Sequence, residues 1–298
     1  MDFKPPPQAE RVAAIGSTAG LPETHRLALE RMSDFEPIPP PKPGDWLAIH
    51  PEEGQTFDDY IRSRPNKPSH SRCKIYLQPL GDFPKDASPA LEFLQMYAAA
   101  YFQMETEVFP PVATRSLTLT ISRNHQILTY DVLAFLKKKL PADAICFLAV
   151  TMEDLYPGPA WNFVFGQASL HDRVGVFSSA RYDPAFYGRE RGEGDQDILL
   201  QRSLKVLAHE TAHMFSLTHC IYFRCIMNGS NHLQESDSRP MHLCPVCLHK
   251  LQFSIGFDVV DRYRRLLAFY HQRGYDDEAR WVAHRLQIIT GYGKSRPE

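Results

Sequence analysis

Residues 209 to 213 read His-Glu-Thr-Ala-His, a pattern whose side chains could hold a metal ion and use it for hydrolysis. His209 and His213 are four residues apart, so on a helix both imidazoles project from one face and can share one tetrahedral zinc ion. Glu210 cannot bind the same ion in that geometry, but it can reach a water molecule on the zinc. Zinc lowers the pKa of such a water to about 7, and Glu210 can take its proton as the water attacks a carbonyl.

His219 is the candidate for the third zinc ligand. It lies six residues beyond His213, and a continuing helix would rotate it by about 600°, well off the ligand face. The helix must therefore end near Ser216, and the chain must turn back there. The alternative is a core helix whose histidines are incidental. It assigns no function to two histidines and a glutamate that lie close together on a mostly apolar helix.

Four of the six cysteines follow at once and suggest a second metal site: Cys220, Cys225, Cys244 and Cys247. Two cysteine pairs separated by roughly 15 to 20 residues are typical of structural zinc, because four thiolates close the coordination shell and exclude substrate. A redox pair at the last two cysteines and a zinc ribbon that binds nucleic acid are the alternatives. Acidic residues offset the few basic ones here, which argues against the ribbon.

The remaining two cysteines, Cys73 and Cys146, are expected to be small buried core residues.

A sheet and a long helix are needed to position these ligands, and the sequence predicts both. Apolar residues at helical spacing indicate helices over residues 88–104, 130–140 and 198–217, the last of which carries His209 and His213. Alternating or continuous apolar runs indicate strands over residues 74–80, 116–122, 144–151, 161–169 and 173–182. Helical patterns over residues 245–270 and 276–290 form a tail. The order predicts a mixed α+β or α/β fold in which helices accompany a mixed sheet.

Proline-rich segments mark the N-terminal part of the chain, with PPP at residues 5–7 and PIPPPKPG at 37–44. We therefore expect residues 1–45 to form an arm with limited independent structure, apart from a short helix over 22–32. Residues 46–72 are polar and rich in turns, so the folded core is expected to begin near Lys74.

The composition narrows the range of partners. A formal net charge of −2 predicts no general attraction to nucleic acid or to acidic membranes. No run approaches the roughly 20 apolar residues of a membrane span, and the first residues lack the pattern of a secretory signal. We expect a monomeric cytoplasmic or nuclear protein, where free thiols stay reduced.

The joint pattern of three histidines and four cysteines resembles the archaemetzincin (archaelysin) family of metzincin metallopeptidases. The resemblance rests on HETAHMFSLTHC with a second cysteine and Met227 after it, on DLYPGPAWNFVFGQASL and on CPVCLHKL. It extends over roughly residues 45 to 270. It implies a twisted mixed sheet with a backing helix and an active-site helix, followed by a small zinc-stabilised helical C-terminal subdomain.

The resemblance also implies the roles of individual residues. His209, His213 and His219 bind the catalytic zinc, and Glu210 acts as general base and acid. The second, structural zinc is held by Cys220, Cys225, Cys244 and Cys247, which gives two zinc ions per chain. Met227 matches the methionine of the turn beneath the catalytic zinc, and residues 161–169 match an edge strand that pairs with substrate. For this strand the alternative is that Trp161, Phe163 and Phe165 simply pack on the sheet.

One residue departs from the family pattern. The family has glycine where this chain has Ser216, and a non-glycine residue at positive φ costs on the order of 1 kcal/mol.

The sequence thus predicts a zinc metallopeptidase that hydrolyses peptides or small polypeptides. The alternative is a catalytically weak, zinc-stabilised module for protein interaction. The expected boundaries are an arm over residues 1–45, a catalytic subdomain over 46–219 and a C-terminal subdomain over 220–298.

Overall fold

The computed structural model describes residues 3–291, which form two compact units. The first unit contains the described residues up to Arg64, the short stretch Ala100–Gln103 and the chain from Leu217 onwards. The second contains Pro65–Ala99 and Met104–Ser216. This division differs from the expected boundaries at residues 45 and 219, because the N-terminal segment packs with the C-terminal part of the chain.

A five-stranded sheet forms the centre of the second unit, in the order β2-β1-β4-β7-β6. The strands are β1 (Lys74–Leu80), β2 (Thr106–Val108), β4 (Ala144–Thr151), β6 (Gly166–Ala168) and β7 (Val174–Ser178). All neighbours are parallel except β6, which is antiparallel to β7 and forms an edge. Every residue of β4 is buried, as its continuous apolar run predicts for a strand covered on both faces.

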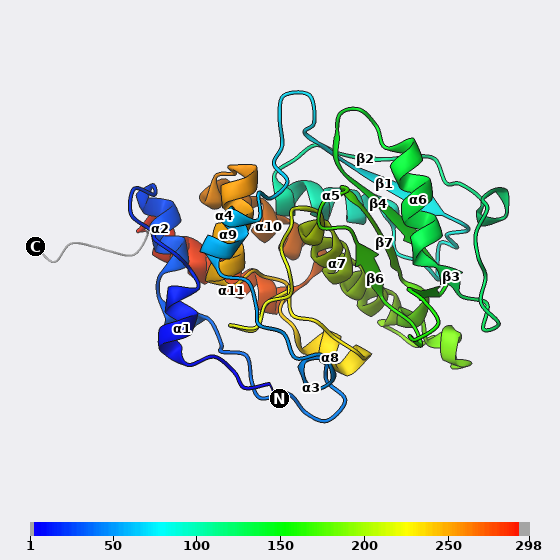
Figure 1. The fold of residues 1–298 in the computed structure, drawn as a ribbon, viewed down its shortest axis with the longest axis horizontal. Coiled ribbons are helices and arrows are strands. Elements are labelled where there is room, and N and C mark those ends of the chain that lie inside the picture. The colour runs from blue at the N-terminus through cyan, green and yellow to red at the C-terminus, as the bar shows by residue number, and fades with distance from the viewer. Residues whose placement is uncertain (1–2, 292–298) are drawn as a thin grey trace, which may run out of the picture. The chain divides into compact units, whose positions relative to one another are not determined.

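Two helices that pack against β7 lie on opposite sides of this sheet, α6 (Thr129–Lys139) and α7 (Asp195–Met214) (Figure 1). Val132 and Leu136 of α6 share a core with Val174 and Val176, which point to the same face of β7. Helix α7 begins with Asp195 and Asp197, whose negative charges suit the N-terminal end of the helix dipole, and His213 lies in its last turn. The sheet thus supports the helix that carries the histidine pattern.

Three predicted strands are shorter than expected or absent. The strand predicted over 173–182 ends with β7 at Ser178, and Ala180–Tyr182 form a 3₁₀ helix. Residues 116–122 form only one isolated bridge, at Ile121, although their apolar residues alternate. Leu117 and Leu119 pack on the sheet core, but the amide of Thr120 donates to the side chain of Asp131 instead of a strand partner. The predicted strand over 161–169 is restricted to β6. Short strands β3 (Ile127–Leu128) and β5 (Leu155–Tyr156) form a separate parallel pair.

The first unit is helical among the described residues. Its helices before the second unit are α1 (Gln8–Ala13), α2 (Glu23–Leu29), α3 (Trp46–Ile49) and α4 (Phe57–Arg62). Those after it are α8 (Leu233–Ser238), α9 (Pro245–Ile255), α10 (Val259–Arg273) and α11 (Asp276–Thr290). The predicted helix over 245–270 is therefore two helices, because Gly256 adopts a positive φ of 79° and Asp258 caps α10.

Helix α5 (Leu91–Phe102) connects the two units in sequence, and its first nine residues belong to the second.

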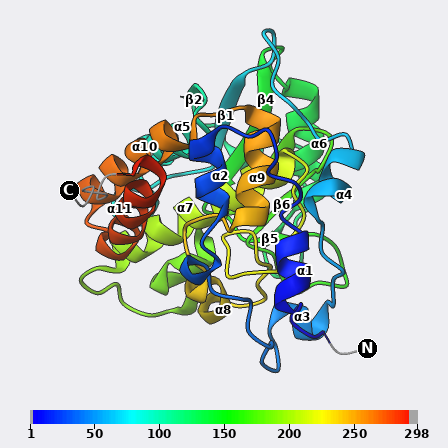
Figure 2. The same ribbon diagram turned by 90° about the vertical axis from the view of Figure 1, so that its left-hand side faces the viewer.

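The N-terminal segment is anchored to the C-terminal helices, contrary to the expectation of an arm with little structure. Helix α2 packs against α9 and α11 (Figure 2). The fully buried guanidinium of Arg285, on α11, pairs with Asp34 and donates to the carbonyl of Ala28 at 2.8 Å. The folded core also begins well before Lys74, since Phe57 and Tyr60 of α4 are buried.

Two further expectations can be compared with the structure. Cys146 is buried, as expected, but Cys73 is exposed, because it precedes β1 and only β1 enters the core.

Among the described residues, none of the helices combines the length and the apolar character needed to cross a membrane.

His25 makes the stability of the first unit depend on pH. Its side chain is buried on α2, and neither ring nitrogen has a hydrogen-bond partner among the described residues. Burial, and then the nearby His249, lower its pKa from 6.5 to about 4. The folded protein therefore keeps His25 neutral where the unfolded chain binds a proton, and stability falls as the pH drops from about 6.5 towards 4.

We predict that His25→Phe loses less stability on acidification than the parent protein. When the pH falls from 7.0 to 5.5, the parent should lose about 1 kcal/mol more unfolding free energy than His25→Phe loses, as measured by urea denaturation. Groups that do not contact His25 titrate equally in both proteins, so they cancel in the comparison. Equal losses for the parent and His25→Phe would show that His25 does not contribute.

Candidate metal centres

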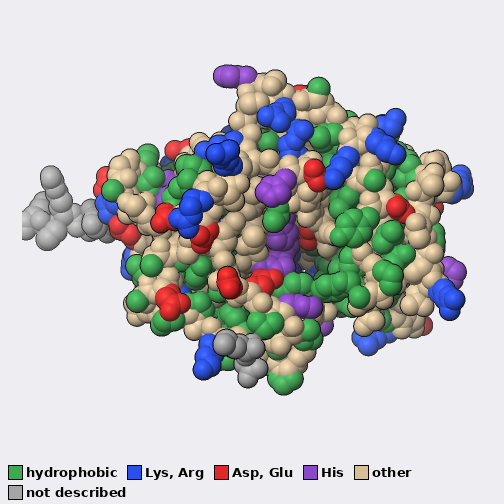
Figure 3. All heavy atoms as spheres, viewed as in Figure 1, with side chains coloured by type: hydrophobic (Ala, Val, Ile, Leu, Met, Phe, Trp, Pro, Cys, Tyr) green, Lys and Arg blue, Asp and Glu red, His purple; other side chains and the backbone are tan. Residues whose placement is uncertain are grey.

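Helix α7 brings His209 and His213 together as their spacing predicts. Their Nε2 atoms lie 3.0 Å apart and their rings are perpendicular. Two nitrogens bound to one zinc at about 2.05 Å and a tetrahedral angle would be about 3.3 Å apart, so the pair fits that ion. The side chain of His209 is buried and that of His213 is partly exposed, which leaves the pair reachable from solvent. Figure 3 shows several histidine side chains (purple) at the surface of the face that it draws.

Glu210 is buried against the edge strand of the sheet. A Cβ atom built on Gly166 of β6 would lie 2.6 Å from both Cδ and Oε1 of Glu210. Only glycine leaves room at this position for the carboxylate. Glu210 is 4% exposed, so its carboxylate is held in a confined place against Gly166.

The outer edge of β6 is an open backbone edge. The carbonyl of Phe165 accepts from Ser178, and the amide of Ser169 donates to Val174, so odd-numbered residues face β7. In an antiparallel pair the residues between them direct their N–H and C=O groups to the other side. Gly166 and Ala168 therefore present backbone groups along the edge beside Glu210.

The aromatic residues before β6 have mixed environments. Phe165 stacks on Tyr182, and the guanidinium of Arg181 lies 3.7 Å from the ring centre of Phe163. Trp161 is 40% exposed. Packing therefore accounts for the two phenylalanines, whereas a role of the strand in substrate binding remains a prediction.

Ser216 reverses the chain two residues after α7 with a φ of 68°, the positive value that the position predicts. Its hydroxyl donates to the carbonyl of Leu170 at 2.7 Å and accepts from the amide of Asn66 at 3.3 Å. The Asn66 side chain also donates to the carbonyl of Met214 at 2.8 Å, at the end of α7. Serine thus supplies hydrogen bonds that offset the conformational cost glycine would avoid.

His219 lies in the first unit, three residues beyond Ser216. Its Nδ1 is 2.8 Å from Oε1 of Glu52, and its ring packs edge-on against Trp46. This contact leaves Nε2 as the atom of His219 that could bind a metal.

The four cysteines of the first unit form a buried cluster without a disulfide. Their sulfur atoms all lie within 4.8 Å of one another, and those of Cys220 and Cys244 are 3.5 Å apart. The backbone amide of Cys244 donates to the sulfur of Cys225. Asn228 organises the loop before it, since its amide donates to the carbonyls of Cys220 and Phe223. Four converging thiols are the donor set of structural zinc.

The electrostatics of this cluster also fit a cation. Burial opposes ionisation of Cys220, but hydrogen bonds from the other three cysteines hold its pKa well below the usual value of a thiol. Burial and the contacts with Cys220 raise the pKa of Cys244. The negative charge on Cys220 therefore disfavours ionisation of a second cysteine, and the positive charge of a divalent ion would offset this repulsion.

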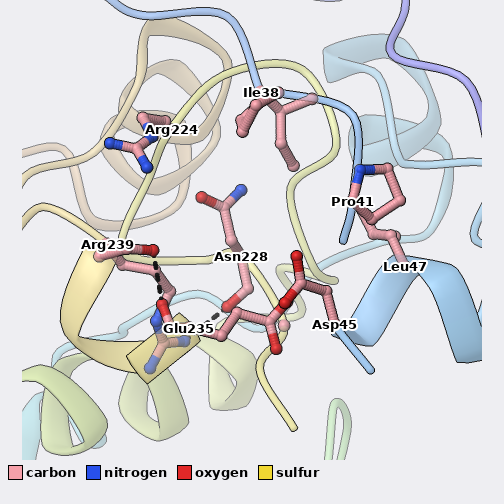
Figure 4. Close-up of a pocket in the computed structure, with 11 residues that line it drawn as sticks. Ile38, Pro41, Asp45, Leu47, Arg224, Asn228, Glu235 and Arg239 are labelled. Atoms are coloured by element: carbon pink, nitrogen blue, oxygen red, sulfur yellow. Dashed lines mark hydrogen bonds between the residues drawn. The ribbon is translucent and has the colours of Figure 1, made fainter. Parts of the chain in front are cut away.

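A third group, Asp45, His232 and Glu235, also brings potential ligand atoms together. Figure 4 shows Asp45 and Glu235 beside a cavity of about 70 Å³ in the first unit. Both ring nitrogens of His232 are already used, by Asp45 and by the amide of Glu235. The Glu235 carboxylate accepts from the amides of Trp46 and Asn231, and its burial raises its pKa. Hydrogen bonds within this group therefore join the start of α3 to the start of α8.

Three residues at these sites escaped the sequence analysis: Glu52, Asn66 and Gly166. Each comes from a segment far from the histidine pattern along the chain. Of them only Gly166 had a signal, as a glycine within an aromatic strand pattern.

Comparisons with known proteins place this arrangement among peptidases. A sequence model of peptidase family M54 matches residues 118–253, which include all seven predicted metal ligands. Archaemetzincin-2 of Homo sapiens is 40% identical, over 88% of this chain and 80% of the relative. Archaemetzincin-1 of Homo sapiens is 32% identical, over 74% of this chain and 51% of the relative. A crystal structure of archaemetzincin from Methanopyrus kandleri is 30% identical, with a TM-score of 0.50, and covers 63% of this chain and 97% of its own.

We predict that Ser216→Ala destabilises the protein more than Ser216→Gly does. Alanine loses both hydrogen bonds and keeps the positive φ, which should cost about 1–3 kcal/mol. Glycine loses the same bonds but recovers about 1 kcal/mol of conformational strain. Urea denaturation of the zinc-loaded variants measures the order, and an alanine variant as stable as the parent would contradict the role assigned to the hydroxyl.

Proposed function

This chain belongs to the archaemetzincin family of zinc metallopeptidases, and on that premise we propose that it hydrolyses peptide bonds in peptides or small polypeptides. The observation that carries this proposal is the set of side chains on α7: the Nε2 atoms of His209 and His213 converge, and the carboxylate of Glu210 is buried and fitted against Gly166 at the edge of the sheet. Two converging imidazoles and a buried carboxylate on one helix are groups that metal-assisted hydrolysis uses.

The catalytic zinc would be held by His209, His213 and His219. When bound, this ion supplies a Lewis acid that polarises the scissile carbonyl and makes water acidic enough to attack near neutral pH. Three protein ligands leave a coordination position for substrate and water, unlike the four cysteines of the second site.

Glu210 is the proposed general base. Its carboxylate takes the proton of the attacking water and then delivers it to the nitrogen of the leaving amine. The narrow space beside Gly166 restricts the rotamers of Glu210, so the side chain loses less conformational entropy when it takes up its reactive position.

The open edge of β6 is the proposed binding place for the substrate backbone. An extended peptide can pair with the exposed N–H and C=O groups of Gly166 and Ala168, as an additional strand does. Backbone pairing depends little on side chains, so it would hold many sequences in the same register beside Glu210.

The four cysteines are proposed to bind a second, structural zinc. Cys220 follows His219 directly, so a closed site there fixes the backbone immediately after the third histidine. This role needs no contact with substrate, which agrees with the burial of all four sulfur ligands.

We predict that Glu210→Gln keeps its metals but loses peptide hydrolysis. The amide cannot accept the proton from water, so kcat should fall by at least about 100-fold. Digestion of an unbiased peptide library, followed by mass spectrometry, measures the loss, and metal analysis verifies loading. A Glu210→Gln variant with the parental rate would exclude this mechanism.

Gly166→Ala serves as a second variant in the same assay. Its methyl group would displace the Glu210 carboxylate without removing it, so kcat should fall while both metals and the stability are retained. Gly192→Ala is the control, because Gly192 is exposed, is not at a positive φ, and a Cβ atom there would meet only the side chain of Asp195, at an ordinary contact distance of 3.5 Å. If neither parent nor variants cleave any peptide, the alternative of a zinc-stabilised interaction module gains support.

A further inference from the structure

The side chain of Glu52 is placed to control the orientation and tautomer of His219. The 2.8 Å contact joins Oε1 of Glu52 to Nδ1 of the imidazole. A carboxylate can only accept, so the proton of neutral His219 lies on Nδ1, and Nε2 is the unprotonated nitrogen, the form in which imidazole binds a metal. Both side chains are largely shielded from solvent, at 28% and 19% exposure, which limits competition from water.

Trp46 holds the same oxygen in place. Its indole N–H donates to Oε1 of Glu52 at 2.9 Å, and its ring meets the ring of His219 edge-on with 5.0 Å between centres. The indole is itself confined, because a Cβ atom on Gly229 would lie 2.4 Å from its Cδ1. Its backbone amide donates to Glu235, which ties the start of α3 to α8.

The loop over residues 52–55 is fixed to the chain on both sides of His219. The side-chain oxygen of Gln55 accepts from the amide of Thr218 at 3.3 Å. The backbone carbonyl of Gln55 accepts from the buried ammonium of Lys250. A Cβ atom on Gly54 would lie 2.6 Å from the side chain of Ile221, so the loop also packs closely after the histidine.

We propose that Glu52 is a positioning residue for the third zinc ligand: it holds the Nδ1–H tautomer of His219 and directs Nε2 to the metal. The proposal rests on the function proposed above. A carboxylate on the second nitrogen of a ligating histidine fixes the ring and raises its basicity, and loss of such a partner typically weakens metal binding about 10- to 100-fold. Glu52 lies outside residues 118–253, so an N-terminal segment beyond the matched family region completes the metal centre.

The test is a zinc titration of the full chain with the four-cysteine site already loaded. Competition with a chromogenic chelator gives the dissociation constant of the second zinc for the parent, Glu52→Gln and Glu52→Ala. We expect weakening of about 10- to 100-fold for alanine. Glutamine should give an intermediate value, because its amide oxygen still accepts both hydrogen bonds but carries no charge. Glu53→Gln, a change at the exposed neighbouring glutamate, should leave the constant unchanged.

Cobalt substitution separates positioning from a general structural role. The absorption of Co²⁺ at a three-histidine site should change in Glu52→Ala, whereas the thiolate bands of Co²⁺ at the cysteines should not. Equal weakening of both metal sites, or a second zinc bound by Glu52→Ala within two-fold of the parent, overturns the proposal. A parent protein that binds only one zinc, or whose peptide hydrolysis survives Glu210→Gln, refutes the proposed function instead.

Discussion

The chain reversal at Ser216 is the constraint on which the rest of the structure depends. The helix that presents His209 and His213 cannot also present His219, because six further helical residues would turn it off the ligand face. The chain therefore leaves the helix with a φ of 68°, and its serine is hydrogen-bonded to Leu170 and to Asn66. Asn66 also caps the carbonyl of Met214, so one residue secures both the helix end and the turn.

Beyond the turn, each residue of a short segment has its own attachment. Thr218 is bonded to Gln55, His219 to Glu52, and Cys220 belongs to the cysteine cluster. A histidine on a loop would lose much conformational entropy on binding a metal. Here that entropy is already lost on folding, through the N-terminal loop on one side and the buried thiols on the other. The proposed structural zinc site and the N-terminal segment would thus both serve to fix His219 before the metal binds.

The sequence was sufficient for features that depend on local pattern. It located β4, the histidine helix, the positive φ of Ser216 and the buried cysteine cluster, and the archaemetzincin resemblance is confirmed by the relatives. It was wrong where partners far along the chain decide the structure. Residues 116–122 alternate like a strand but pair with β3 only through an isolated bridge at Ile121, and the proline-rich N-terminal segment is anchored by Arg285, more than 250 residues away from Asp34. Glu52 could not be found for the same reason, because nothing near it in sequence indicates His219.

Zinc analysis together with zinc-edge X-ray absorption of the purified full chain tests whether the histidines bind a metal ion. We predict two zinc ions per chain and an average coordination shell that combines sulfur at about 2.3 Å with nitrogen or oxygen at about 2.0 Å. Changing His213 to alanine should reduce the nitrogen component and leave the sulfur component intact. One zinc per chain with sulfur ligands alone, at saturating zinc, would contradict a histidine metal centre and the hydrolytic function built on it.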